Sequence, residues 1–155
     1  MIRILHLSDF HFKNKNQSDF KHVSDKIAKS LEGRHIDVIV FTGDLVHQVK
    51  SPQDFKQAAN VLFDPILSTL KLSADNILIV PGNHDMSRDA EMKMVSESLD
   101  LKKNIRDLDD FCNDKQQLNA SLTRFDSYLD FIKEFYADGN VSISDLYITF
   151  TRNIH

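Results

Sequence analysis

Three stretches of this sequence place metal-binding types of side chain directly after an apolar run. The stretches are LHLSDFHF (5–12), VIVFTGDL (38–45) and ILIVPGNHD (77–85). Carboxylate oxygens, imidazole nitrogens and amide oxygens are ligands that ions such as Mn²⁺, Fe²⁺ and Zn²⁺ accept in proteins. An imidazole can also move a proton during catalysis. The side chains concerned are Asp9, His11, Asp44, Asn83, His84 and Asp85.

Each of these apolar runs is predicted to be a strand of a parallel sheet. The predicted strands span residues 2–7, 37–43 and 76–82, and their β-branched composition is typical of strands that are covered on both faces. The carboxyl ends of parallel strands meet at one edge of a sheet, where α/β proteins bind ligands. Since residues i and i+2 of an extended segment point the same way, Asp9 and His11 are expected to converge there with the other polar residues.

Two glycines stand where the chain must turn after a strand. Gly43 precedes Asp44, and Gly82 precedes Asn83, with Pro81 stiffening the second turn. A residue without Cβ allows a sharp turn and a close approach of other atoms. We therefore expect these turns to present the polar side chains to the crevice at the sheet edge.

Helical patterns separate the predicted strands. Apolar residues from Phe20 to Leu31 recur every three or four positions, and Gly33 stands where a helix would end. A second pattern begins at Pro52, and Pro65 inside it is expected to kink the helix or to begin a new one. The alternation predicts an α/β fold in which a βαβαβ sheet is layered with helices.

The character of the sequence changes after residue 86. Residues 88–117 are polar and are expected to be helical or inserted, and a third helix is predicted from Leu118 to Tyr136. The segment LYITFT (146–151) predicts a further strand, which we expect to be unpaired. The chain is expected to be a single domain over residues 1–155. Its core is expected at residues 1–86, a helical insertion or cap at 87–138, and the start of a second half at 139–155.

Composition indicates an ordinary globular protein. The chain has 155 residues, of which 41% are hydrophobic and 27% are charged, and its net charge is −4. This acidic balance offers no broad basic field for nucleic acid or for an anionic membrane. The single cysteine, Cys112, suits a reducing compartment, and the first apolar run is too short for a signal peptide. We expect a cytoplasmic protein that binds no membrane.

The three motifs together resemble those of the calcineurin-like metallophosphoesterases. The matching pieces are SDFH, TGDL and PGNHD, in this order and each after a predicted strand, over about residues 1–86. The resemblance implies that Asp9 and His11 bind a first metal ion. It also implies that Asp44 bridges this ion to a second one, which Asn83 binds.

The same resemblance implies the chemistry of the site. His84 would act near the scissile phosphate as a general acid or as a stabiliser of transition-state charge, within hydrogen-bond reach of Asp85 or a backbone carbonyl. Asp85 would hold His84 in orientation. Two divalent ions, with Mn favoured and Fe or Zn as alternatives, would promote hydrolysis of a phosphoester, and a phosphodiester is favoured.

The sequence departs from the family pattern in its second part. The family completes its site with further histidines, including a Gly-His-x-His motif, which does not occur here, and after residue 85 the only histidine is His155. The chain therefore resembles the first half of the family's α/β sandwich. We expect the isolated chain to be a poor or inactive phosphoesterase that needs the missing C-terminal half or a partner chain.

Two other functions stay open. One is a nuclease of the double-strand-break-repair type, for which nucleic acid is a possible partner, although the acidic balance argues mildly against it. The other is a non-catalytic regulatory or binding module that keeps a partial metal site. The metal stoichiometry separates enzyme from module, because an enzyme would bind two ions per chain and a module one or none.

Two features near the predicted crevice have a plain structural interpretation. His47, three residues after Asp44, is expected to have a structural role. The loop that begins at Lys13 is expected to be solvated. The alternative is that Lys13, Asn14 or Lys15 borders the phosphate site.

Overall fold

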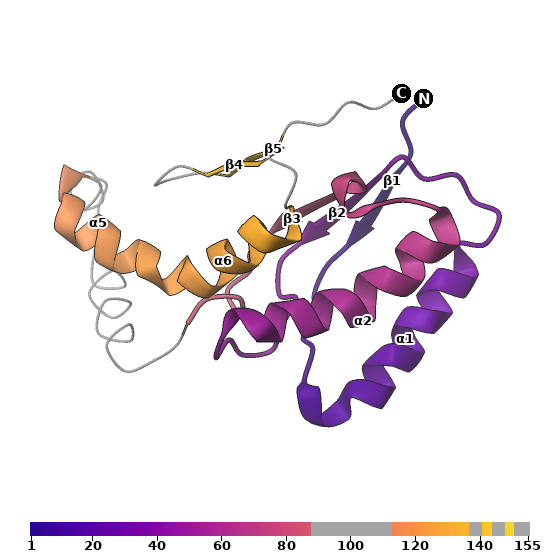
Figure 1. Cartoon of the computed structure of the whole chain (residues 1–155), viewed down its shortest axis with the longest axis horizontal. Helices are drawn as coiled ribbons and strands as arrows, with labels where there is room; N and C mark the ends of the chain where they lie inside the picture. The colour runs from indigo at the N-terminus through magenta and orange to yellow at the C-terminus, as the bar shows by residue number, and fades with distance from the viewer. Residues whose placement is uncertain (88–112, 137–140, 144–147, 151–155) are drawn as a thin grey trace, which may run out of the picture.

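The computed structural model describes residues 1–87, 113–136, 141–143 and 148–150 of the chain, and Figure 1 shows their arrangement. One sheet contains three parallel strands in the order β1 (Ile4–Leu7), β2 (Val38–Thr42) and β3 (Ile77–Val80). The longer helices are α1 (Gln17–Ser30), α2 (Pro52–Leu70), α5 (Lys115–Leu122) and α6 (Asp126–Phe135). The 3₁₀ turns are η1 (Asn14–Asn16), η2 (Ala74–Asn76) and η3 (Thr123–Phe125). The predicted α/β fold with its βαβαβ core is confirmed. Residues 88–112 of the predicted helical insertion or cap (87–138) lie outside the described residues.

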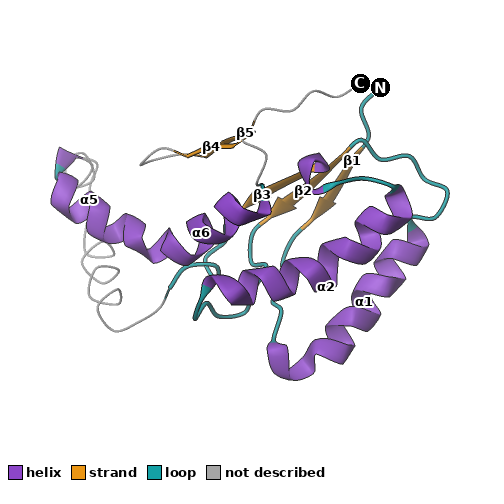
Figure 2. Ribbon diagram, in the orientation of Figure 1, coloured by secondary structure: helices purple, strands orange, loops and turns teal. Residues whose placement is uncertain are grey.

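One face of the sheet forms the hydrophobic core. The strand register places two rows of apolar side chains on this face, Leu5–Ile39–Ile77 and Leu7–Phe41–Ile79. The helices α1 and α2 lie side by side against the sheet (Figure 2) and contribute the buried residues that cover these rows. Burial of apolar area on this face is the main force that holds helices and sheet together.

The opposite face is more open than the sequence predicts. Ile4 in β1 and Val80 in β3 keep 59% and 46% of their surface exposed. On the same face, Nε2 of His6 lies 2.7 Å from Oγ1 of Thr42. The prediction that these strands are covered on both faces is wrong for the described residues, because α1 and α2 pack on one face only.

The helix α2 is continuous through its internal proline. It begins with a capping box in which the Asp54 carboxylate accepts the Ser51 N–H at 2.9 Å. Pro65 lies inside the helix, so the prediction that a new helix begins there is wrong. The neighbouring side chains of Phe63 and Ile66 are buried, and their packing offsets the ~3 kcal/mol that an internal proline costs.

The helix α6 covers the free edge of β3. The hydroxyl groups of Tyr128 and Tyr136 donate hydrogen bonds of 2.8 Å to the carbonyl oxygens of Ile79 and Ile77 respectively. Burial raises the pKa of Tyr128 well above its ordinary value. These two bonds satisfy carbonyl groups that a neighbouring strand would otherwise occupy, so α6 closes this edge of the sheet.

The predicted third helix is interrupted. A 3₁₀ turn, η3, separates α5 from α6, and the carbonyl of Arg124 in this turn accepts the N–H of Ser87 at 2.9 Å. This bond ties the segment after β3 to the break between the helices. Beyond the break, α6 packs on α2, where the ring of Phe131 stacks on Phe55 with centroids 5.4 Å apart.

A second, small sheet lies near the end of the chain. β5 (Ile148–Phe150) pairs with β4 (Val141–Ile143) in the antiparallel sense. The predicted strand at 146–151 is therefore present, but the prediction that it is unpaired is wrong. Of the helices in the described ranges, none has the length and apolarity that a membrane span requires.

Candidate metal centre

The segments that follow β1 and β2 are joined to each other at the carboxyl edge of the sheet. The N–H groups of Asp9 and His11 donate to the carbonyl oxygens of Gly43 and Asp44 at 3.0 and 2.9 Å. Because these hydrogen bonds continue the parallel pairing beyond the strands, the two segments leave the sheet together. The first and second motifs are therefore neighbours in space.

Three of the predicted ligands have a left-handed backbone. The φ angle is 58° at Asp9, 50° at His11 and 60° at Asp44. Residues other than glycine are uncommon in this region, and such strained positions, at about 1–3 kcal/mol each, gather at functional sites. The reason given for the convergence of Asp9 and His11, the alternation of side chains along an extended segment, is wrong, because neither residue has an extended backbone. The left-handed backbone at both residues directs the two side chains.

The two glycines allow the segments after β2 and β3 to touch. Gly43 has a φ of 98°, and a Cβ at this position would lie 2.7 Å from Cα of Gly82. A Cβ on Gly82 would in turn collide with the carboxylate of Asp44. The predicted close approach is thus present, and it brings the third motif against the second.

Asp9, His11 and Asp44 converge on a common point, as predicted. Each offers one ligand atom, and the three atoms lie within 4.8 Å of one another. Nε2 of His11 lies 3.6 Å from Oδ1 of Asp9 and 3.8 Å from Oδ2 of Asp44. An ion with ligand distances of ~2.0–2.6 Å fits between donors at this spacing. Two carboxylates and one imidazole suit Mn²⁺, Fe²⁺ or Zn²⁺, so the residues present fit a divalent metal.

Asp44 is held in place from both of its neighbouring segments. Its Oδ1 accepts the backbone N–H of His84 at 2.8 Å, which leaves Oδ2 on the side of His11. Its own N–H donates to the carboxylate of Asp85 at 2.7 Å. The Asp44 side chain is therefore positioned before any ligand arrives.

Asp85 is buried, and it binds backbone groups instead of the His84 ring. Its carboxylate accepts four N–H groups at 2.7–3.2 Å, from Asp44, Leu45, Val46 and Gly82. Burial raises the pKa of Asp85, and the backbone N–H groups act in the opposite direction. The prediction that Asp85 orients His84 is wrong, because all four contacts tie the loops together and none reaches the ring.

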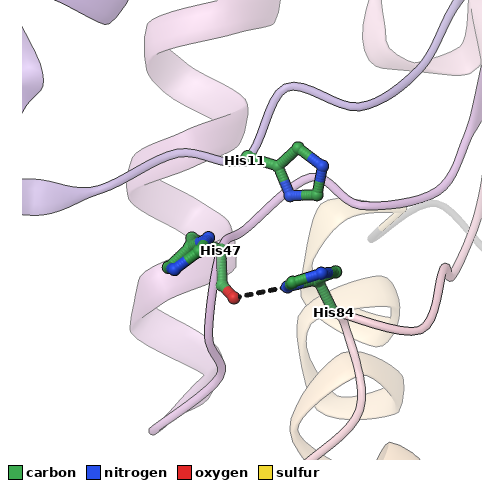
Figure 3. Close-up of side chains that lie close together, drawn as sticks. All are labelled: His11, His47 and His84. Carbon is green, nitrogen blue, oxygen red and sulfur yellow. Dashed lines mark hydrogen bonds between the residues drawn. The ribbon is translucent and has the colours of Figure 1, made fainter.

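The rings of His11, His47 and His84 lie close together, as Figure 3 shows. The ring centroids of His11 and His84 lie 4.7 Å apart, and those of His47 and His84 lie 5.4 Å apart. Nδ1 of His84 lies 2.8 Å from the carbonyl oxygen of His47, so this nitrogen carries a proton and donates it. The expected hydrogen bond from His84 to a backbone carbonyl is present. Because Nδ1 is engaged in this bond, Nε2 is the nitrogen of the His84 ring that can exchange a proton.

His47 belongs to the site, which the sequence did not predict. The ligand atoms of His11, His47 and His84 also lie within 4.8 Å of one another, so a metal ion could lie among the three rings as well. The backbone N–H of His47 donates to the carbonyl of Phe12 at 3.1 Å, which extends the pairing of the first two segments. The only available signal was its place three residues after Asp44.

Asn83 is exposed and lies between the glycine and the histidine of the third motif. Its backbone neighbours are fixed by the bonds of His84 to Asp44 and of Gly82 to Asp85. Its role as a metal ligand stays a prediction.

Comparison with known proteins agrees with this geometry. The family model for calcineurin-like phosphoesterases matches residues 2–152. The chain belongs to this family. A relative in Bacillus subtilis (strain 168), the uncharacterized metallophosphoesterase-like protein YydB, is 29% identical over 139 residues. The aligned part covers 86% of this chain and 28% of that relative, so the chain spans less than a third of the relative's length.

Proposed function

We propose that this chain carries the first metal site and the proton-transfer group of a two-metal phosphodiesterase. One observation carries the proposal, namely the convergence of the ligand atoms of Asp9, His11 and Asp44 within 4.8 Å. Bound divalent ions would supply the positive charge that activates a water nucleophile and neutralises phosphate oxygens during in-line attack. Mn is the ion that we favour, with Fe or Zn as alternatives.

In this proposal Asp44 is shared by both ions, because its two oxygens face different neighbours. Oδ2 lies on the side of His11, and Oδ1 lies beside the third motif, where it accepts the N–H of His84. Asn83, next to His84 in the sequence, would be the protein ligand of the second ion. The hydrogen bond from His84 to Oδ1 would keep the carboxylate from rotating when an ion is exchanged.

His84 is proposed to act on the leaving oxygen and not on the metal. Its Nδ1–H is held by the carbonyl of His47, so Nε2 is the position from which a proton is given to the leaving group. The proposed place of action is the cytoplasm.

A binding or regulatory module is the second candidate. The observation that favours it is the shortage of ligands for the second ion, for which the predicted set provides only Asp44 and Asn83. The first site, with three converging donors, is expected to bind one ion whether or not the chain turns over a substrate. The number of ions bound per chain therefore decides between the two functions.

The proposal is tested by metal content and turnover measured on the same variants. His84→Gln is expected to keep its Mn²⁺, because Asp9, His11 and Asp44 remain in place. Its rate of hydrolysis of bis(p-nitrophenyl) phosphate is expected to fall about 10²–10⁴-fold, because the proposed proton donor is lost. His11→Gln is expected to lose the ion itself. The matched control is His22→Gln, because His22 is exposed on α1. Loss of metal from His84→Gln, or full retention of metal by His11→Gln, contradicts the proposed roles.

A further inference from the structure

A cavity of about 540 Å³ opens beside His47, one of the three clustered histidines. His47 lines it, together with Phe12, the residue that follows His11. Because the rings of His47 and His84 lie 5.4 Å apart, the wall of the cavity at His47 is next to the proposed proton donor. Small-molecule sites commonly have volumes of about 300–1,000 Å³, so there is room for much more than one phosphate group.

The polar lining of this cavity is cationic, although the whole chain carries a net charge of −4. Lys13, Lys15 and Lys50 line it, and within the described part of the chain none of the three forms an ion pair with a carboxylate. Lysine ammonium groups bind phosphate as point charges with several donors. Three such groups around one cavity, in an acidic protein, indicate an anionic occupant.

The one acidic residue of the lining does not cancel this charge. The Oδ2 atom of Asp54 accepts the backbone N–H groups of Lys50 and Ser51, both at 2.9 Å, in the cap of α2. A carboxylate that is held by two N–H groups at a helix N-terminus has its charge partly satisfied by the helix dipole. The lysines therefore remain available to a ligand.

We propose that this pocket binds a second phosphate group of the substrate, so that the substrate is a phosphoester carrying another phosphate several ångströms from the scissile one. The inference rests on the proposed function, in which metal ions bind the scissile phosphate and His84 protonates its leaving oxygen. An uncharged alcohol in the same pocket would gain no charge–charge interaction with the three ammonium groups. A nucleotide with two phosphates matches both the charge and the size of the pocket.

The experiment compares two ligands that differ in one phosphate. Thymidine 5′-phosphate and thymidine 3′,5′-bisphosphate are titrated calorimetrically into the full 155-residue chain with Mn²⁺ present. The bisphosphate is expected to bind at least about tenfold more tightly, since three partly exposed charge pairs contribute modestly each. The preference should fall to about twofold or less in the Lys13→Gln/Lys15→Gln variant. It should also shrink in ~1 M salt, where screening is almost complete.

Lys29→Gln is the matched control, because Lys29 is an exposed lysine in the last turn of α1, outside the pocket. It should keep the preference of the unmodified chain. Equal affinity for the two ligands overturns the inference, as does a preference that survives in the pocket variant or an absence of measurable binding by the bisphosphate. Failure of the proposed function has a different signature, in which the binding of thymidine 5′-phosphate does not depend on Mn²⁺.

A third ligand distinguishes the sources of the second phosphate. In the dinucleotide pTpT the second phosphate is an internal diester of a nucleic-acid backbone. A gain for pTpT as large as that for the bisphosphate supports the pocket and assigns it to an oligonucleotide. A gain for the bisphosphate alone supports the pocket and assigns it to a small phosphorylated molecule.

Discussion

The core face of the sheet and its carboxyl edge are formed by the same three strands, but different forces hold them. On the core face, Ile39 and Phe41 are fully buried under apolar helix residues, and the contacts are non-directional. At the carboxyl edge, the segments are held by hydrogen bonds from backbone N–H groups to one buried carboxylate, Asp85. Several residues there also have a strained backbone.

This difference predicts which substitutions affect the stability of the fold alone and which also affect the candidate metal site. Apolar burial stabilises the fold without fixing the direction of any single side chain. The hydrogen bonds of Asp85 fix the direction of the Asp44 segment, and with it the position of a predicted ligand. Damage to the core should therefore lower stability and spare metal affinity in the folded protein, whereas damage around Asp85 should lower both.

The largest effect is expected for Asp85→Ala. Four backbone N–H groups lose their acceptor, two of them in buried and two in part-buried hydrogen bonds. Each unsatisfied buried group costs about 1–3 kcal/mol, so the free energy of unfolding should fall by about 4 kcal/mol or more. Mn²⁺ affinity should fall with it. Urea denaturation and a metal titration measure the two effects. Asp19→Ala, at an exposed position in the first turn of α1, should change stability by no more than about 0.5 kcal/mol. An Asp85→Ala protein as stable as this control would contradict the proposed role of Asp85 in holding these segments together.

Phe131→Ala should lower stability by about 3–5 kcal/mol, because Phe131 is 1% exposed and stacks on Phe55 in the contact between α6 and α2. The variant protein that remains folded should keep its Mn²⁺ affinity within about twofold. Phe131→Leu, which keeps most of the volume, should recover most of the loss. A metal affinity that falls in parallel with the stability would mean that the core and the site are not separable.

The smallest effect is expected for Tyr128→Phe. The variant loses one buried hydrogen bond, to the carbonyl of Ile79, at about 1 kcal/mol. It should also change the alkaline stability curve. Because the folded pKa of Tyr128 is raised, its contribution is complete below the unfolded pKa of about 10 and is lost as the pH rises from there toward the folded value.

Denaturation measured from pH 8 to pH 11.5 checks this prediction. The unmodified chain should lose stability above about pH 10 more steeply than Tyr128→Phe. Parallel curves for the two proteins would mean that Tyr128 ionises without unfolding the edge of β3.

Much of the fold follows from local patterns in the sequence. The three strands begin and end within two residues of their predicted bounds, since apolar β-branched runs between turn residues are specified locally. The continuity of α2 through Pro65 was not predictable, because it depends on the packing of α2 in the folded core. The closure of the β3 edge by Tyr128 was not predictable either, since that contact spans 49 residues.

The candidate metal site likewise has features that the sequence predicts and features that it does not. The convergence of Asp9, His11 and Asp44 follows from the position of the motifs after parallel strands. Their left-handed backbone does not, since it is imposed by hydrogen bonds between segments that are far apart in the sequence. The place of His47 depends on the same bonds, and no residue type nearby indicates it.

Anomalous diffraction from a crystal soaked in Mn²⁺ is the most direct test of whether Asp9, His11 and Asp44 form one metal site. An anomalous peak is expected within about 2.0–2.6 Å of one atom of each of the three side chains. A second peak beside Asn83 that shares Asp44 would support the two-metal proposal. The three histidines offer a competing position, because their ligand atoms also lie within 4.8 Å of one another. A single peak coordinated by His11, His47 and His84 without Asp9, or no peak at this edge of the sheet, would contradict the account.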